Sequence, residues 1–446
     1  MEVLSEANLF LSRGRCCLAL NSPRVFVLFV LLTASTAHLA AAANVTATRL
    51  DGTTVAGELR GWNESGVTIA APAGEQQIAL DQLISLRWPA EPESSKPAEA
   101  AAGTAELTDG TLIPLSSLSV TGDVATIKVQ RSGDPKEIAV SLSATQIAAI
   151  QFQHLDEPLA KQWDEIRRLN LASDVLVVLK RDGTSLDYVE GVLGQITDDK
   201  VEFKLEGESN RVDRAKVAGV IYYRADRRTP TEPRMLLQGR SGLRASATTV
   251  RFDDALVEIT TAAGAEFAWP VDDIEFADFS AGKVMYLSDI EPASRKWTPL
   301  VGLPTGVTLA AEYGQPRRNH SAFGETLTLL LRDKDAGSAE QGTLRSFTKG
   351  LALRSRTELV YRLPAGFNRF TALAGIDPAT NATGNVRLAI LADDRPLLET
   401  EIAGSQPPQP IDVQITGAKR LKIVVDFGQN LDTGDWLNLC DAKIVK

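Results

Sequence analysis

Cysteine is scarce in this chain, which has three in 446 residues. Cys16 and Cys17 precede an apolar run near the N-terminus, and only Cys440 lies beyond it. If that N-terminal segment is removed, the remaining chain can form no internal disulfide. Such low cysteine content argues against a small disulfide-stapled fold, and it is typical of a bacterial envelope protein that relies on its hydrophobic core.

Histidine and the common catalytic motifs are also scarce. Beyond the N-terminal segment only His154 and His320 remain, and their separation fits neither a zinc site nor a catalytic triad. The chain has no GxSxG elbow, no Gly-rich phosphate loop followed by Lys, and no HExxH. The sequence therefore predicts a protein that is not an enzyme. A glycoside hydrolase using two carboxylates stays open as an alternative, because such a pair leaves no sequence motif.

Positive charge is in deficit as well. The 47 Lys and Arg residues face 57 Asp and Glu residues, which gives a net charge of −10. An acidic surface repels phosphate backbones and anionic lipids. We therefore expect no nucleic-acid partner.

The N-terminal segment, residues 1–43, has the order of a secretory signal peptide. Arg13, Arg15 and Arg24 precede the apolar run Val25 to Leu32, and small residues follow up to Ala43. We expect cleavage near Ala43, a secreted, periplasmic or cell-envelope location, and no membrane span after cleavage. A retained membrane anchor is the alternative, since Val25 to Ala43 approaches the roughly 20 residues that span a bilayer.

Four stretches resemble one another and are named repeats 1 to 4: residues 44–88, 104–153, 174–224 and 234–280. The first three open with a short strand and an Asp-Gly turn, at Asp51-Gly52, Asp109-Gly110 and Asp182-Gly183. Alternating apolar residues follow, and an apolar pattern spaced by three closes each repeat. About five short strands in so few residues favour a small closed sheet. The repeats thus resemble SH3-like or Sm-like barrels by pattern only.

Two segments separate the repeats. Residues 89–103 are rich in Pro, Ala and Glu without an apolar period, which indicates a linker. In residues 154–173, Leu159, Trp163 and Ile166 follow Asp156 at helical spacing. This pattern predicts an amphipathic connecting helix.

Residues 282–446 carry several ordered motifs. They include Lys349-Gly350, the segment Glu358 to Tyr361, Phe370, the turn Gly375 to Asp377, Gly417-Ala418, Asp426, and the final segment from Asp435-Trp436 to Asp441. This combination resembles the NPCBM family of candidate carbohydrate-binding modules, found beside glycoside hydrolase catalytic domains of family 98 type. The resemblance implies a galactose-binding-like jelly-roll β-sandwich and a carbohydrate-binding role.

The chain departs from this family at two places. Arg354-Ser355 and Thr433-Gly434 stand where many members carry His-Ala pairs, so a ligand held by those histidines is not expected. The segment Thr298 to Ser346, which contains Arg317 and Arg318, also looks longer than a minimal module needs. The alternating residues Val386, Leu388 and Ile390, like Leu421, Ile423 and Val425, independently predict sandwich strands.

A sugar site needs an aromatic face and charged groups that hydrogen-bond hydroxyls. We predict that this site contains Arg354, Arg356, Asp377, Asp435 and Trp436. Tyr313 and Trp297 are further aromatic candidates. The alternatives are a core position for Trp436, a solvated strand face for the two arginines, and a turn-forming role for Asp377.

The acidic loop after Asp426 has a composition that suits Ca²⁺. Asp426, Asn430 and Asp432 are its candidate ligands, and a plain acidic surface loop is the alternative.

Taken together, the sequence predicts an exported, non-catalytic, all-β protein that binds a glycan or envelope polysaccharide through its C-terminal sandwich. Its repeats would serve as a stalk or would dock envelope proteins. A structural or protein-interaction component of the envelope without sugar binding is the main alternative.

Overall fold

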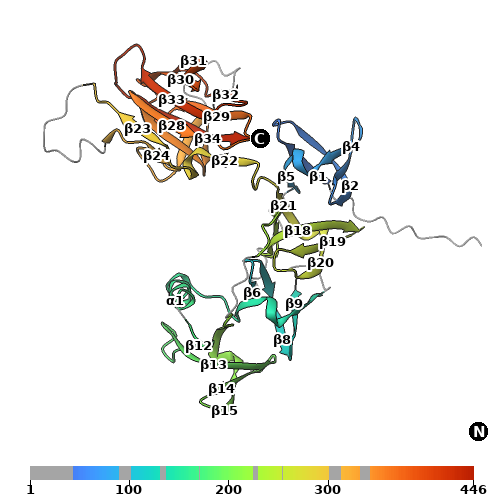
Figure 1. Cartoon of the computed structure of the whole chain (residues 1–446). Helices are drawn as coiled ribbons and strands as arrows, with labels where there is room; N and C mark the ends of the chain where they lie inside the picture. Colours follow the sequence, from blue (N-terminus) through green and yellow to red (C-terminus); the bar gives the residue numbers. More distant parts are fainter. Residues whose placement is uncertain are drawn as a thin grey trace, which may run out of the picture. The chain divides into compact units, whose positions relative to one another are not determined.

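The computed structural model describes residues 44–89, 102–130, 137–169, 171–224, 230–253, 255–300, 313–331 and 342–446. The predicted signal peptide and most of the predicted linker lie outside these residues. The described chain is nearly all β, with one α-helix among its elements (Figure 1). This confirms the predicted fold class. Among the described residues, no helix has the length and apolar composition needed to cross a membrane.

Repeats 1 and 2 are antiparallel meanders. Repeat 1 contains β1 (Asn44–Arg49), β2 (Thr54–Asn63), β3 (Gly66–Ala71), β4 (Gly74–Ala79) and β5 (Leu83–Arg87). Repeat 2 contains β6 (Gly103–Leu107), β7 (Leu112–Leu115), β8 (Ser117–Thr121), β9 (Val124–Gln130), β10 (Glu137–Ser143) and β11 (Ile147–Gln151). A proline, Pro114, lies in β7, and the strand that is continuous in repeat 1 is divided into β7 and β8 in repeat 2.

Repeats 3 and 4 follow the same plan. Repeat 3 contains β12 (Asp174–Leu179), β13 (Leu186–Ile196), β14 (Lys200–Leu205), β15 (Glu208–Asp213) and β16 (Val217–Ile221). Repeat 4 contains β17 (Met235–Gly239), β18 (Arg244–Asp253), β19 (Leu256–Thr261), β20 (Glu266–Pro270) and β21 (Ile274–Asp278). In all four repeats the last strand pairs with the first, and a 3₁₀ turn precedes it.

The Asp-Gly turns have the backbone conformation that glycine favours. Gly52, Gly110 and Gly183 have φ values of +83°, +82° and +70°, in the left-handed region that a Cβ atom makes unfavourable. In each turn the preceding aspartate accepts a backbone N–H two residues on, as Asp182 does from Thr184 at 3.1 Å. This local bonding explains how a short sequence signal fixes where each meander turns.

The last strands join the repeats in two pairs. Strand β5 of repeat 1 pairs antiparallel with β21 of repeat 4, with Leu86 opposite Ala277. Strand β11 of repeat 2 pairs in the same way with β16 of repeat 3, with Ile150 opposite Val220. These four residues occupy the same position in their repeats, so each joint brings equivalent strands together about a local two-fold relationship.

Backbone hydrogen bonds flank both joints in the same pattern. In the first joint, Trp88 N–H donates to Glu275 O at 3.0 Å, and Phe279 N–H donates to Ile84 O at 2.8 Å. In the second joint the donors are Phe152 and Tyr222, at 2.9 Å each. In every repeat, the aromatic residue that directly follows the last strand therefore donates a backbone hydrogen bond across the joint.

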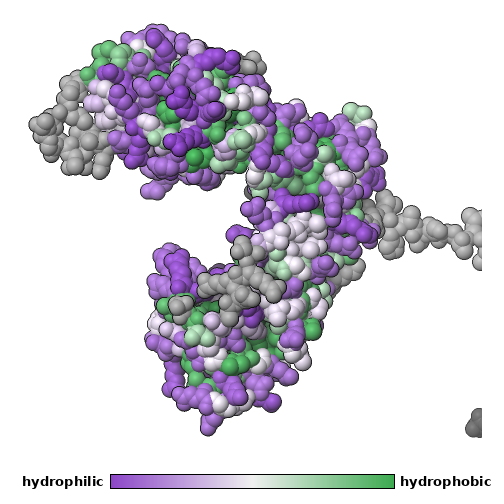
Figure 2. Space-filling view, in the orientation of Figure 1, coloured by the Kyte–Doolittle hydropathy of each residue, from purple (hydrophilic) through white to green (hydrophobic). Residues whose placement is uncertain are grey.

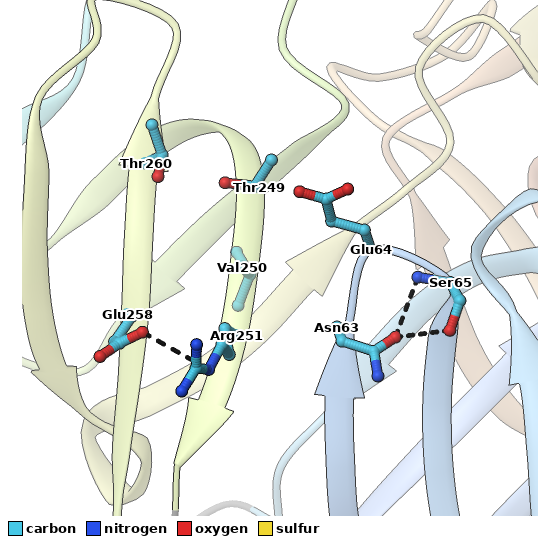
Figure 3. Close-up of a pocket in the computed structure, with 8 residues that line it drawn as sticks. All are labelled: Asn63, Glu64, Ser65, Thr249, Val250, Arg251, Glu258 and Thr260. Atoms are coloured by element: carbon cyan, nitrogen blue, oxygen red, sulfur yellow. Dashed lines mark hydrogen bonds and ion pairs between the residues drawn. The ribbon is translucent and has the colours of Figure 1, made fainter.

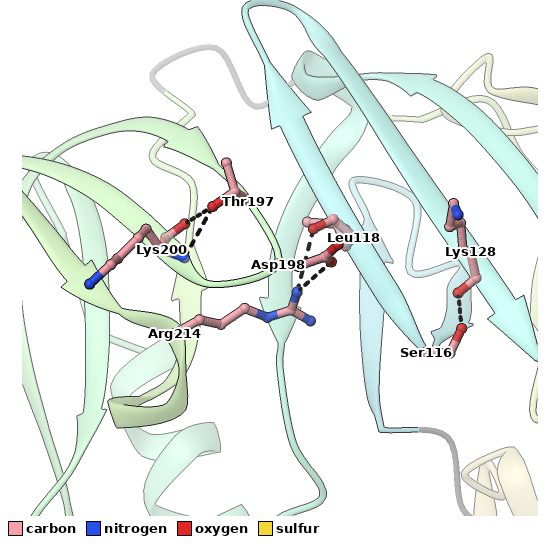
Figure 4. Close-up of polar contacts among 7 residues, drawn as sticks. All are labelled: Ser116, Leu118, Lys128, Thr197, Asp198, Lys200 and Arg214. Carbon is pink, nitrogen blue, oxygen red and sulfur yellow. Dashed lines mark hydrogen bonds and ion pairs between the residues drawn. The ribbon is translucent and has the colours of Figure 1, made fainter.

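Side chains reinforce the second joint. Arg214 of repeat 3 donates to the carbonyl oxygen of Leu118 in repeat 2 at 3.5 Å and to Asp198 at 3.3 Å (Figure 4). Its guanidinium also lies 4.7 Å from the centre of the Phe152 ring. Burial lowers the pKa of Arg214, and the negative charge of Asp198 offsets part of this decrease.

The helix α1 (Glu157–Arg167) covers the second joint. Asp156 caps its N-terminus by accepting the Leu159 N–H at 3.1 Å. Its buried residues Leu159, Trp163 and Ile166 pack with Val175, Ala218 and other residues of β11, β12 and β16. The spacing of the apolar side chains therefore places one face of the helix on the paired strands.

The C-terminal region is a sandwich of two main antiparallel sheets. One has the order β24 (Arg317–Arg318), β27 (Gly350–Arg354), β34 (Trp436–Val445), β29 (Arg369–Ile376) and β32 (Gln409–Gln414), with β22 (Val284–Tyr286) also paired to β34. The other has the order β23 (Ser294–Trp297), β28 (Thr357–Arg362), β33 (Arg420–Phe427), β30 (Asn385–Ala392) and β31 (Arg395–Ala403). A hairpin of β25 (Leu327–Leu331) and β26 (Thr343–Phe347) packs on the first sheet through Leu329.

The sandwich core lies between these sheets. The alternating residues Val386, Leu388 and Ile390 are fully buried, as are Leu421, Ile423 and Val425, and they pack with Phe370, Leu439 and other residues of the opposite sheet. This confirms the predicted sandwich strands. The face of the sandwich visible in Figure 2 is mostly hydrophilic, with apolar side chains only in small groups.

Candidate functional site

Most of the predicted site residues meet at one end of the first sheet of the sandwich. Strand β27 ends at Arg354, which pairs with Trp436 at the start of β34. On the other side of β34, Asp377 follows β29 and its N–H donates to Trp436 O at 2.9 Å. Arg356 lies in the turn after β27 with a φ of +61°. The sheet register thus brings together motifs that are about 80 residues apart in the chain.

Trp436 forms the base of this site. Its side chain is only 1% exposed. The rings of Tyr313 and Phe323 meet it edge-on, with centroid distances of 5.9 Å and 6.0 Å. These two rings are themselves 50% and 52% exposed. Trp436 therefore occupies the core position that was the alternative to a surface role, and the aromatic surface that reaches solvent belongs to Tyr313 and Phe323.

Trp297, the other aromatic candidate, supports the segment that carries Tyr313. A Cβ atom on Gly314 would lie 1.9 Å from the Trp297 ring, so only glycine fits beside it. The Trp297 indole N–H donates to Ser355 O at 3.2 Å. Trp297 therefore fixes the position of Tyr313 from below.

Arg354 is held in place from two sides. Its side chain is 12% exposed and donates to the carbonyl oxygen of Asp432 at 3.1 Å and to its carboxylate at 3.3 Å. The guanidinium also lies over the Tyr313 ring, 4.9 Å from its centre. Both contacts fix the orientation of the guanidinium before any ligand arrives.

Asp435 is a buried carboxylate with one oxygen unused by the described residues. Its Oδ1 accepts the Asn385 N–H at 3.0 Å, while its Oδ2 has no hydrogen-bond partner there. Burial raises the pKa of Asp435 to about 6, opposed by the Asn385 N–H, by the nearby Ser355 hydroxyl and by Arg354. The Ser355 hydroxyl is close enough to act on this pKa but does not reach hydrogen-bond geometry.

Asp377 is saturated by protein partners. Its Oδ1 accepts the Ala379 N–H at 3.0 Å, which caps a short 3₁₀ turn. Its Oδ2 accepts the Ser321 hydroxyl at 2.6 Å and the Asn438 amide at 2.9 Å. The carboxylate is 2% exposed, so it fixes the loops of the site and has no free oxygen to offer a ligand.

Several buried polar atoms at this end, Asp435 Oδ2 among them, have no hydrogen-bond partner among the described residues. Buried polar groups in proteins nearly always have a partner, in the protein, in water or in a ligand. The end of the sheet therefore offers donors and acceptors to a polar molecule. The atoms are Arg317 Nε, Ser355 Oγ, Thr357 Oγ1, Asp435 Oδ2, Trp436 Nε1 and Asn438 Oδ1.

The residues proposed as Ca²⁺ ligands are engaged elsewhere. Asp432 pairs with Arg354, the Asn430 amide donates to Thr383 O, and Asp426 accepts the Phe427 N–H at 2.9 Å. Within the part of the chain that the structure describes, no three His, Cys, Asp or Glu side chains gather in a way that could hold a metal ion. The calcium hypothesis thus gains no support from this loop.

Sequence reasoning missed Phe323 and did not assign Arg317 to the site. Both belong to the segment that looked longer than a minimal module needs. Strand β24 pairs with β27 and places Arg317 opposite Ala352, next to the site. No periodicity marks such a short strand, so only the pairing shows where this segment lies.

The raised pKa of Asp435 predicts a pH effect on stability. A carboxyl group whose pKa is higher in the folded state binds its proton more tightly when folded, so stability falls as pH rises from about 4 to about 6. Asparagine at this position can still accept the Asn385 N–H and carries no charge. We expect Asp435→Asn to raise the free energy of unfolding by about 1 to 2 kcal/mol at pH 7.5 and to leave it unchanged near pH 4.

Thermal unfolding of both proteins at the two pH values measures this difference. If Asp435→Asn instead destabilises the protein at the higher pH alone, the charge is stabilised in the fold, and Arg354 outweighs the cost of burial.

A pocket among the repeats lies away from these residues. The turn Asn63-Glu64-Ser65 of repeat 1 faces strands β18 and β19 of repeat 4 across it (Figure 3). Arg251 and Glu258 form an exposed ion pair at 3.7 Å on its wall. Exposed pairs of this kind contribute little to stability and do not by themselves indicate chemistry.

Comparisons with solved structures give several weak similarities. CBM51 from Clostridium perfringens GH95 in complex with methyl-galactose aligns at 23% identity over 36% of this chain and 99% of that chain, with a TM-score of 0.30. The tandem CBM51 modules of Sp3GH98, the family 98 glycoside hydrolase from Streptococcus pneumoniae SP3-BS71, align at 12% identity over 77% and 88% of the two chains, with a TM-score of 0.30. These TM-scores are too low to assign a function.

A third similar structure contains the CBM51-2 and INT domains of Clostridium perfringens ZmpB in complex with GlcNAc. It aligns at 16% identity over 55% of this chain and 43% of that chain, with a TM-score of 0.30. This chain therefore spans less than half of that structure. No curated protein matches the chain.

The family comparison is more specific. The model of the NPCBM/NEW2 domain matches residues 283–445, which include both sheets of the sandwich and the site at its end. The ordered motifs around Arg354, Asp377 and Asp435-Trp436 lie within this match. Residues 283–445 therefore form an NPCBM/NEW2 domain.

Proposed function

We propose that the C-terminal sandwich binds a glycan at the end of its first sheet. The observation that carries this proposal is the pair of half-exposed rings, Tyr313 and Phe323, set on the buried Trp436 beside polar atoms that lack partners among the described residues. Aromatic faces suit the C–H faces of a sugar ring, and fixed polar groups suit its hydroxyls. The NPCBM/NEW2 match supports the same role.

In this proposal the predicted site residues act in two ways. Arg354, oriented by Asp432, and the free oxygen of Asp435 hydrogen-bond sugar hydroxyls. Asp377 and Trp436 hold the loops and the exposed rings in position. Arg356, in the turn after β27, lies at the rim.

For the whole chain we propose an exported, non-catalytic binding protein of the cell envelope. The N-terminal signal pattern, the scarcity of histidine and the absence of catalytic motifs support this. The joined repeats would carry the sandwich as a stalk and could dock envelope proteins. The ligand would be a glycan or an envelope polysaccharide.

One observation favours the alternative of an interaction component without sugar binding. Asp377 is saturated, and Arg354 already has a carboxylate partner in Asp432. A site whose polar groups satisfy one another can be purely structural.

Replacing Tyr313 with Ala tests whether the site binds a glycan or is purely structural. We expect Tyr313→Ala to weaken glycan binding about tenfold or more, because it removes an exposed stacking face. The free energy of unfolding should change by less than about 1 kcal/mol, since the ring is half exposed. Binding of the full chain to a glycan array, followed by calorimetry with the best ligand, measures the affinity.

Tyr188→Ala is a matched control. Tyr188 is 39% exposed and lies on repeat 3, outside the sandwich, so its loss should leave glycan affinity unchanged. Folded protein that binds no glycan on the array would refute glycan binding and leave the interaction component.

A further inference from the structure

Strand β24 presents two neighbouring arginines with different surroundings. Successive side chains of a strand point to opposite faces of the sheet. Arg318 pairs with the carboxylate of Glu291. Arg317 lies instead over the buried Trp436, with its guanidinium carbon 5.9 Å from the ring centre. The strand thus directs Arg317, and not Arg318, into the candidate site.

The side chain of Arg317 has no hydrogen-bond or ion-pair partner among the described residues. Its Nε is buried and unpaired. Leaving a buried N–H without a partner is unfavourable, so a structure that keeps one usually supplies a partner from water or a ligand. The ring of Trp436 stabilises the guanidinium in place but offers it no hydrogen-bond acceptor.

Two carboxylates of the candidate site are engaged by other groups, and Asp435 is engaged through one of its two oxygens. Asp432 holds Arg354, and Asp377 holds Ser321 and Asn438. The oxygen of Asp435 that has a partner accepts the Asn385 N–H. Two guanidiniums therefore approach one indole ring, at 5.7 Å for Arg354 and 5.9 Å for Arg317, and only Arg354 has a carboxylate partner among the described residues.

We propose that the site recognises an acidic glycan, in which a sugar carboxylate binds the Arg317 guanidinium while the sugar ring packs on Tyr313 or Phe323. This inference rests on the proposed glycan-binding function and specifies its ligand class. A guanidinium offers a planar fork of N–H donors that matches the two oxygens of a carboxylate. The chain carries a net charge of −10, so its surface elsewhere repels such a ligand and the binding is confined to this site.

The test compares acidic sugars with their methyl esters. Oligosaccharides that contain galacturonate, glucuronate or sialate are each presented to the full chain beside the methyl ester of the same sugar, which removes the charge and keeps the ring. We expect at least one acid to bind about tenfold or more tightly than its ester, with the difference shrinking as salt increases. A sulfated galactoside is included to distinguish sulfate from carboxylate recognition.

Two variants assign the effect to one residue. Arg317→Gln should remove the preference for the acid over the ester, and Arg317→Lys should restore part of it. Arg318→Gln, the neighbour that pairs with Glu291, should leave the preference intact. Circular dichroism and melting of each variant confirm that the sandwich is folded.

Four results would overturn the inference. Equal affinity for acid and ester, or a preference retained by folded Arg317→Gln, removes the role of Arg317 and leaves glycan binding itself standing. If only the sulfated sugar binds, the site recognises a sulfate group and not a carboxylate. Failure of the folded chain to bind any glycan, neutral or acidic, rejects the proposed function together with the inference.

Discussion

Replacing Trp436 with Ala should destabilise the C-terminal sandwich by about 3 to 5 kcal/mol, the range for removing a buried large aromatic side chain. The ring is 1% exposed at the start of β34 and is contacted by Tyr313, Phe323, Arg317 and Arg354. Its loss would leave a cavity beneath both exposed rings. Amide hydrogen exchange of β27 and β34 in the full chain measures this local stability without requiring that the whole protein unfold in one step.

Trp436→Phe is the control for volume. Phenylalanine keeps one aromatic ring at the site, and it removes the second ring of the indole together with an N–H that has no partner among the described residues. It should therefore cost less than the alanine variant. Wild-type exchange rates in Trp436→Ala would show that the ring is not the packing centre of the site. Glycan binding lost in Trp436→Ala follows from instability, whereas binding lost in Tyr313→Ala does not.

Replacing Gly219 with Ala should destabilise the joint between repeats 2 and 3 by about 2 to 3 kcal/mol, the upper part of the range for overpacking. A Cβ atom at Gly219 would lie 2.3 Å from the Ile150 carbonyl oxygen and 2.6 Å from the Trp163 ring. The first neighbour is backbone of the paired strand β11, and the second is the buried tryptophan of α1. Neither can move without loss of pairing or of helix packing.

Gly61→Ala is the matched control for Gly219→Ala. Gly61 also lies within a strand, but the nearest atoms to its added Cβ are 3.6 Å away, on the Thr68 side chain. It should change stability by about 0.5 kcal/mol or less, because the contact is an ordinary one. Limited proteolysis of repeat 3 in the full chain reports the difference. Equal resistance of the two variants would show that the strands of the joint are not held at the described distance.

The predicted elements that matched the structure are those with a local cause. The helix α1 follows from the spacing of Leu159, Trp163 and Ile166 and from its cap at Asp156. The buried alternation of Val386, Leu388 and Ile390 needs only a strand with one face inward. Each of these depends on interactions among near neighbours in the chain.

The pairing of the repeats could not be predicted in the same way. A period of two tells which face of a strand is buried but not which strand lies beside it. Leu86 lies opposite Ala277, and Ile150 lies opposite Val220. Nothing in the sequences of the last strands shows that repeat 1 pairs with repeat 4 and not with repeat 2. The choice depends on contacts across nearly 200 residues in the first joint.

For the candidate site, the sequence by itself determined which residues to consider: Asp435 and Trp436 lie in an ordered family-like motif, and Arg354 lies where the chain departs from the family. Only the tertiary structure decided their roles. The register of β27 with β34 buries Trp436 and turns Arg354 toward Asp432, and the pairing of β24 with β27 brings in Arg317. The physical reason is that burial and charge pairing depend on which segments share a surface, and sequence patterns record only what each segment would bury.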